Sequence, residues 1–152
     1  MSNMDKVISN LKTILDDERL KSDSPLSDIK RIYYGDPINI DEHNLPAIII
    51  NFPQWNYQQS LHCTLFIIIA YSQSTYLSDN PTDVVNTVKN IVIQSEAIRD
   101  ILKRNPNLAI NNDPLTSACD LSKITSIKPS YNSERDPYTF ELVLTFEATV
   151  KI

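Results

Sequence analysis

The most regular pattern of apolar and polar residues lies at the C-terminal end of the chain. From Tyr138 to Ile152 every second residue is apolar, and the residues between them are polar except Val143. A period of two is typical of a β-strand with two different faces. At about 3.3 Å per residue such a strand would reach about 50 Å, whereas a domain of this length has a radius of gyration of about 15 Å. We therefore expect the strand either to bend over its own core or to pair at its far end with a neighbouring subunit.

Two segments have apolar residues at the spacing of an α-helix. In residues 3–20 apolar residues recur every three or four positions, which places them along one side of a helix. A second helix is expected to begin after Asn80, because Asn80–Asp83 supplies a cap, a first-turn proline and a first-turn acid. Its apolar stripe continues to about Arg104, and the polar residues from Asn105 onward end it.

Four further segments are rich in β-branched and aromatic residues and are expected to form strands. They span residues 29–34, 45–52, 61–71 and 124–131. The segment 61–71 is largely apolar at both alternate sets of positions, which is typical of a central strand covered on both faces. The order is helix, three strands, helix, two strands. It predicts a single α+β domain over residues 1–152, with a mainly antiparallel sheet packed against two helices and a long C-terminal β-hairpin.

Pro53 marks an irregularity at the end of the second strand. The large residues before it, Ile50 and Phe52, have one parity, whereas Trp55 and Tyr57 after it have the other. An extra residue in the strand would produce this switch. We therefore expect a β-bulge or bend at Pro53.

The residues around Trp55 also lack charge. Between His43 and Ser78 there is no Asp, Glu, Lys or Arg, although the overall 22% of charged residues would place about eight there. Core strands explain part of this absence. The remaining segment, Gln54 to Ser60, is polar and aromatic, a composition that favours the centre of a subunit interface. The alternative, that Trp55 and Tyr57 cover the domain's own core, is equally compatible with the sequence.

The charge-free window and the last strand are the two candidates for a subunit contact. An exposed strand edge as long as the last strand would invite aggregation unless another element covered it. The candidate interface residues, taken from both segments, are Phe52, Trp55, Tyr57, Tyr138, Phe140, Glu141 and Val143.

Charge and composition exclude several classes of function. A net charge of -5 and a pI near 4.9, without a cluster of Lys and Arg, argue against nucleic-acid binding. Gly35 is the only glycine, so neither a Walker loop nor a dinucleotide-binding loop can be built. Charged residues interrupt the N-terminal apolar residues, and the longest apolar run spans only residues 65–71. We therefore expect no signal peptide and no membrane anchor, and a protein made in a cytoplasm.

Few residues could carry chemistry. Cys63 and Cys119 belong to no metal-binding or redox motif, so both are expected to be free thiols. His62 adjoins Cys63, but neighbours along a strand point to opposite faces and do not readily form a catalytic pair. The loop Asp41–His43 could hold a metal ion through its oxygen atoms, but a solvated loop is the simpler interpretation. We expect no catalytic residue, no metal and no cofactor, and a protein that is not an enzyme.

The order of the elements, in an acidic chain of 152 residues, resembles that of the tail terminator and tail completion proteins of tailed bacteriophages. Gly35-Asp36-Pro37 followed by Leu45–Ile50 also resembles the early part of that family. The resemblance implies a subunit of a homohexameric ring in the virion, assembled in the bacterial cytoplasm. Such a ring caps the tail tube, ends its polymerisation and joins the tail to the head connector. The implied partners are further copies of the chain, the tail tube protein, the connector protein and, in contractile tails, the sheath protein.

Two other interpretations remain open. A neck or head completion protein, or the cap of a contractile injection system, would share this architecture and this mode of assembly. A small-ligand binding module or an unrecognised enzyme would instead use the acids of the loop Asp36–Glu42.

Overall fold

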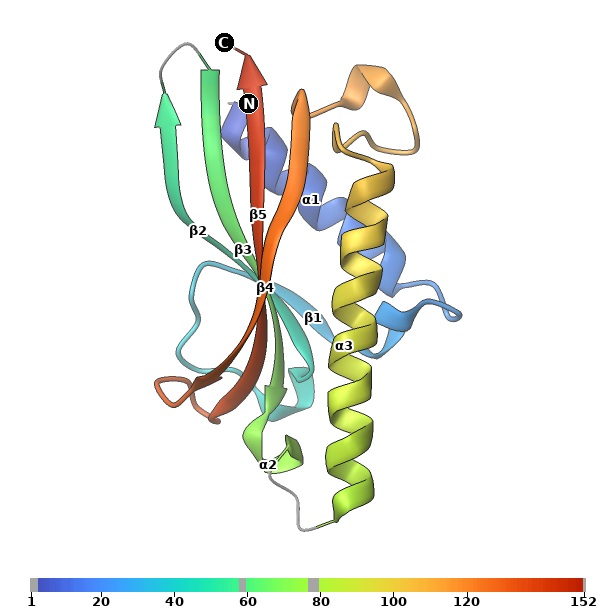
Figure 1. Ribbon diagram of the computed structural model, residues 1–152, viewed down its shortest axis with the longest axis vertical. Coiled ribbons are helices and arrows are strands. Elements are labelled where there is room, and N and C mark those ends of the chain that lie inside the picture. Colours follow the sequence, from blue (N-terminus) through green and yellow to red (C-terminus); the bar gives the residue numbers. More distant parts are fainter. Residues whose placement is uncertain (1–2, 58–59, 77–79, 152) are drawn as a thin grey trace.

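The computed structural model describes residues 3–57, 60–76 and 80–151 (Figure 1). The long helices are α1 (Asn3–Arg19) and α3 (Pro81–Arg104), and the short helix α2 (Gln73–Tyr76) precedes α3. The strands are β1 (Arg31–Tyr34), β2 (Ala47–Tyr57), β3 (Ser60–Ser72), β4 (Leu121–Asn132) and β5 (Thr139–Lys151). Three 3-10 helices, Pro25–Asp28, Glu42–Asn44 and Pro114–Thr116, lie in the connections. The predicted α+β class and the order of the two long helices and five strands are confirmed.

Both long helices form for the reasons that the sequence indicates. The buried residues of α1 recur at helical spacing, and they are Met4, Val7, Leu11 and Leu15. At the start of α3 the side chain of Asn80 accepts a hydrogen bond of 3.0 Å from the backbone N–H of Thr82, and Pro81 follows as the first helical residue. No helix in the described segments has the length and apolar character needed to cross a membrane.

The strands form one sheet in the order β1-β2-β3-β5-β4. β1 is parallel to β2, and the other pairs are antiparallel. β5 pairs with β3 from Thr139 to Lys151 and with β4 on its other side. Both edges of the long last strand are thus occupied within the subunit. Of the two alternatives for this strand, the structure shows the first, because β5 twists over its own core and offers no edge to a neighbour (Figure 1).

Two strands that flank the β3–β5 pair are irregular at the same level of the sheet. In β2 the register shifts between Asn51 and Gln54, which confirms the bulge predicted there. In β4 it shifts between Ile124 and Ser126, and both shifts lie at the level of Phe146 in β5. Bulges increase the local twist, and the strands of the sheet cross one another in the middle of the molecule in Figure 1. The sheet therefore has an upper half, towards the chain termini in Figure 1, and a lower half.

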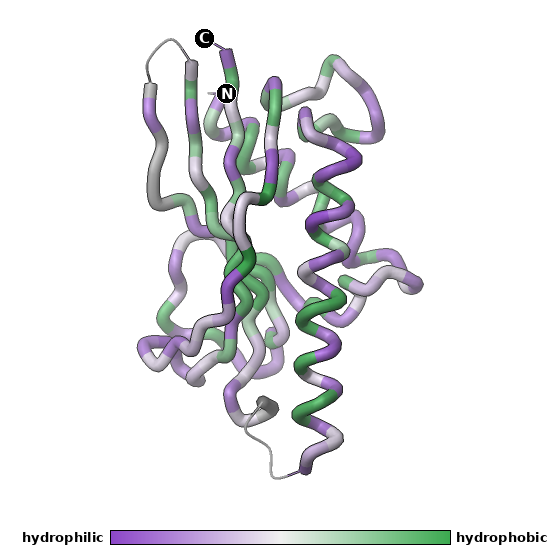
Figure 2. The backbone as a smooth tube through the Cα atoms, viewed as in Figure 1, coloured by the Kyte–Doolittle hydropathy of each residue, from purple (hydrophilic) through white to green (hydrophobic). Residues whose placement is uncertain are grey.

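The helices cover one face of the sheet, where buried residues of α1, α3 and the strands form the main hydrophobic core. On the other face a smaller cluster of Ile40, Ile49, Ile68 and Ala70 covers the lower half. The apolar segments converge where the strands cross (Figure 2). In the upper half this second face is open, and His62 is exposed there. The prediction that residues 61–71 are covered on both faces is therefore wrong for their first part, because the loop that contains Ile40 covers only the lower half.

Candidate subunit interface

The seven candidate interface residues lie in different surroundings. Phe52 and Val143 are half-buried and pack against the main core and the smaller cluster respectively. Tyr138 is 59% exposed. Trp55 and Tyr57 belong to β2 by their backbone, which pairs with Cys63 and Leu61 of β3, but their side chains lie outside the described part of the structure.

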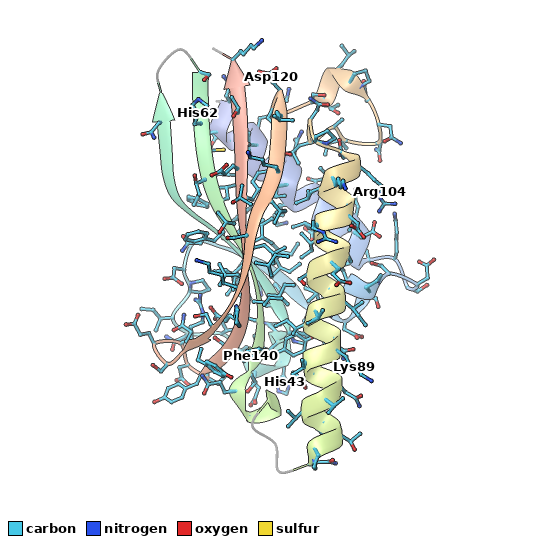
Figure 3. The ribbon with its side chains drawn as sticks, viewed as in Figure 1. His43, His62, Lys89, Arg104, Asp120 and Phe140 are labelled. Carbon is cyan, nitrogen blue, oxygen red and sulfur yellow. The ribbon has the colours of Figure 1, made fainter. Side chains whose placement is uncertain are left out.

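Phe140 and Glu141 offer little surface to a neighbouring subunit, because both side chains are buried in their own subunit. Phe140 lies in the main core, near the lower end of the sheet (Figure 3). Glu141 has the opposite parity and was expected on a polar face. It is only 2% exposed, and it forms an ion pair with the buried side chain of Arg135.

Arg135 is the centre of a buried polar cluster. Its Nε atom donates a hydrogen bond of 2.7 Å to Oε2 of Glu141, which also accepts one from the hydroxyl of Thr139. Its Nη1 atom donates to the carbonyl oxygen of Pro37 at 2.5 Å and lies 2.8 Å from Oδ1 of Asp36. The side chain of Arg135 is only 3% exposed. Each of these contacts pairs the buried charges with a group of opposite charge or a hydrogen-bonding partner, which is what their burial requires.

The cluster joins two distant segments of the chain. Backbone hydrogen bonds from Ile40 N to Asp136 O, at 3.0 Å, and from Asp136 N to Ile38 O, at 2.7 Å, lie beside it. The connection between β4 and β5 is thereby attached to the loop after β1. This loop carries Ile40 of the smaller cluster. The ion pair therefore helps to hold the loop that covers the lower half of the sheet.

The acids of the loop Asp36–Glu42 have structural partners. Asp36 pairs with Arg135, and the side chain of Asp41 caps a 3-10 helix by accepting a hydrogen bond from His43 N at 2.9 Å. The described residues contain no group of three or more His, Cys, Asp and Glu side chains arranged to hold a metal ion. These contacts favour a structural interpretation of the loop.

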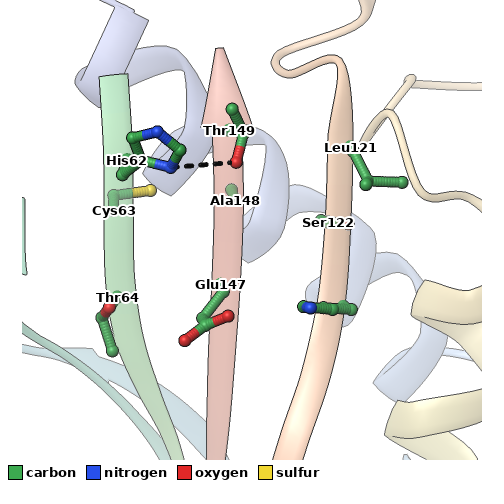
Figure 4. A pocket seen from close by; sticks show the side chains of 9 residues that line it. His62, Cys63, Thr64, Leu121, Ser122, Glu147, Ala148 and Thr149 are labelled. Carbon is green, nitrogen blue, oxygen red and sulfur yellow. Dashed lines mark hydrogen bonds between the residues drawn. The ribbon is translucent and has the colours of Figure 1, made fainter. Parts of the chain in front are cut away.

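A shallow cleft of about 300 Å³ lies on the open face of the upper half, across β3, β5 and β4 (Figure 4). The His62 ring is hydrogen-bonded to the hydroxyls of Ser60 at 2.9 Å and Thr149 at 3.3 Å. Cys63 points to the opposite, buried face. This arrangement is that of a solvated antiparallel sheet face and not of a thiolate-imidazole pair.

Both cysteines are free and buried. Burial raises the pKa of the Cys63 thiol, and burial is also the main cause that raises the pKa of Cys119 to about 11. Thiolates are the reactive form of cysteine. The two thiols are thus suited to packing and not to chemistry.

We expect the native protein to react with an aromatic disulfide reagent at about pH 8 only as fast as it unfolds. The raised pKa also predicts a pH dependence, because above the ordinary pKa of 9.0 the unfolded state loses a proton that the folded state keeps. The contribution of Cys119 to stability should therefore be complete below pH 9 and decline between about pH 9 and 11. Rapid labelling of the native protein would contradict the burial of both thiols, and labelling in denaturant serves as the control.

Two stretches of strand edge have no strand partner in the described parts of the chain. β1 pairs only with Ala47–Ile50, so the outer edge of β2 is free from Asn51 to Tyr57. β4 is the last strand in the order and pairs only with β5. The free part of β2 contains no charged residue, whereas β4 carries Lys128 and Pro129, residue types that protect edges from unwanted pairing.

Neither a protein-family model nor a curated protein matches this chain. The resemblance to tail terminator and tail completion proteins therefore rests on the order of the elements and on the short motifs from Gly35 to Ile50.

The sequence pattern did not indicate two features of the structure, the burial of Arg135 and the free edge of β4. Arg135 lies in a polar connection, where no periodicity marks it as buried. The free edge of β4 depends on the order of the strands, whereas alternation identifies the faces of a strand and not its neighbours. For β5 the only signal was its length. That length was compatible with a strand that bends over its own core and with one that pairs with a neighbouring subunit.

Proposed function

We propose that the protein is a structural assembly subunit that forms a ring, of six copies, on the end of a bacteriophage tail tube. The ring ends polymerisation of the tube and joins the tail to the head connector. The observation that carries the proposal is the order of the elements, a long helix, three strands, a long helix and a C-terminal hairpin. This is the order on which the resemblance to tail terminator and tail completion proteins rests.

The two free sheet edges support the same proposal. A closed ring with cyclic symmetry repeats one heterologous contact, so each subunit needs two different and complementary surfaces. The free edges of β2 and β4 lie on opposite sides of the sheet and differ in composition. A subunit with these two edges has the surfaces that such a contact requires.

Two of the alternatives share this architecture. Neck or head completion proteins and the caps of contractile injection systems would also assemble through repeated contacts. A gene located between those of a connector and a tail tube protein would favour the terminator. Neighbouring genes for an ATPase and spike proteins, without capsid genes, would favour the injection system. The small-ligand module is less well supported, because Asp36 and Asp41 are held in structural contacts.

Electron microscopy and mass measurement of the purified protein would test the proposal. We expect closed rings of roughly 100 kDa, six times the 17.3 kDa of one chain, with an open lumen. Added to the tail tube protein encoded in the same genome, the protein should shorten the tubes and occupy one of their ends. Tubes that grow to the same length with and without it, and that carry no ring, would contradict the proposal.

A further inference from the structure

The free edges of β2 and β4 lie at the same level of the sheet. The pairing registers place Gln54 of β2 in one row with Thr64, Glu147 and Lys123. By the same pairings Asn56 is in one row with His62, Thr149 and Leu121. The free end of β2 and the first residues of β4 are therefore at equal height on the two sides of the upper half.

The two strands also run in opposite directions. β2, β3, β5 and β4 are successively antiparallel, so β4 is antiparallel to β2. A rotation about an axis parallel to the strands would bring the β2 edge of one copy beside the β4 edge of the next without a shift along that axis. The strands would then meet antiparallel. Repetition of a contact without such a shift closes into a ring when the rotation is a whole fraction of a turn, whereas a shift would produce a helical filament.

The start of β4 borders a cleft that an added strand could enter. This cleft, of about 260 Å³, lies between β4 and the C-terminal part of α3. Leu102, Pro106 and Ile124 give it an apolar floor, and Arg99 and Lys103 lie on its helical side. Extended segments bind to other proteins in this way, with backbone hydrogen bonds to an edge strand and side chains in adjacent pockets.

One side of α3 continues this surface along the helix. Val85, Val88 and Val92 are 50%, 38% and 42% exposed. Their spacing of three and four residues, continued through Glu96 to Arg99 and Lys103, places all six residues on one side of the helix. Apart from the acid Glu96, the stripe is apolar and cationic, and its Arg99 and Lys103 are chemically suited to aromatic residues, since Arg and Lys bind to the faces of Trp and Tyr.

The free segment of β2 has the complementary composition. Its sequence from Asn51 to Tyr57 contains three aromatic residues and no charged residue. It would bring neither a like charge to Arg99 and Lys103 nor an unpaired acid into the cleft. An edge of this kind, in a chain that otherwise contains 22% charged residues, lacks the charges that keep edges of monomeric proteins apart.

We propose that the free edge of β2, Asn51–Tyr57, pairs antiparallel with the start of β4, Leu121–Ile124, of a second copy of this chain, beside the exposed side of α3. The pairing joins the sheets of neighbouring subunits into one continuous ring. This inference rests on the proposed function, for which it specifies the subunit contact.

Disulfide cross-linking with the double variant Asn56→Cys/Leu121→Cys tests the contact. Both positions are exposed, so the fold should tolerate the changes. Within one subunit they are separated by β3 and β5, about 14 Å across three strand spacings, which is too far for a disulfide. In the proposed contact the two positions would be cross-strand neighbours. We expect mild oxidation to give a ladder of covalent oligomers that ends at the ring.

Three controls accompany the test. Each single variant should give no ladder. In the pair Asn56→Cys/Lys128→Cys the second cysteine lies about 23 Å further along β4, so this pair should not cross-link beyond the background of the single variants. The native Cys63 and Cys119 are buried and should not contribute. Equal melting temperatures for all variants would show that the fold is retained.

The outcomes separate the contact from the function. Oligomers of native size that do not cross-link through positions 56 and 121 would overturn the inference and leave the ring intact. Cross-linking that stops at a dimer would support the strand pairing and overturn the ring. A protein that neither cross-links nor assembles, in solution or on tail tubes, would overturn both.

Discussion

Replacing Arg135 by methionine is expected to lower the free energy of unfolding by about 3–5 kcal/mol, because the Glu141 carboxylate would remain buried without its cation. Arg135 and Glu141 are each 3% exposed in their side chains and lie 2.7 Å apart. The substitution also removes the hydrogen bond to Pro37 O. Chemical denaturation followed by circular dichroism would measure the loss.

The double variant Arg135→Met/Glu141→Leu is the matched control. It removes both charges, so most of the lost stability should return, as is found when buried ion pairs are replaced by apolar residues. A surface control is Lys21→Met, which breaks the exposed contact of 3.0 Å with Glu18 and should change the stability by less than about 0.5 kcal/mol. An Arg135→Met variant as stable as Lys21→Met would show that the buried pair contributes little.

The location of this pair explains why no sequence pattern indicated it. Glu141 has the parity of a polar strand face, and alternation alone predicts that such a residue meets solvent. The loop after β1 covers that face in the lower half. Ile40 N of this loop donates a hydrogen bond to Asp136 O, and Pro37 O accepts one from the Arg135 side chain. A contact between segments about 100 residues apart leaves no trace in local periodicity.

Other features were predictable because they depend on local chemistry. The start of α3 follows from Asn80 and Pro81, and the bulge in β2 follows from the change of parity at Pro53. The neighbours of β5 were not predictable, since a period of two is the same for an edge strand and an inner one. That distinction matters for the candidate interface. Phe140 and Glu141 were candidates because β5 could have been an edge strand, but the free edges belong to β2 and β4.

Phe146 connects the twist of the sheet to its stability. Among the side chains that the structure describes it is the largest fully buried one, and it lies at the level where both β2 and β4 shift register. The twist at this level brings the two halves of the sheet into their observed orientation. A cavity at this position would remove packing beneath both bulges at once.

The variant Phe146→Ala is therefore expected to lose about 3–5 kcal/mol of unfolding free energy, from lost apolar burial and from the cavity that remains. For a chain of this length the melting temperature should fall by roughly 6–20 °C. Tyr138→Ala is the matched control, because this aromatic residue of the same region of chain is 59% exposed and should change the stability by less than about 0.5 kcal/mol. If Phe146→Ala melted at the same temperature as Tyr138→Ala, the core would not depend on packing at this row. If instead Phe146→Ala unfolded in two separate transitions, the two halves of the sheet would be independent folding units.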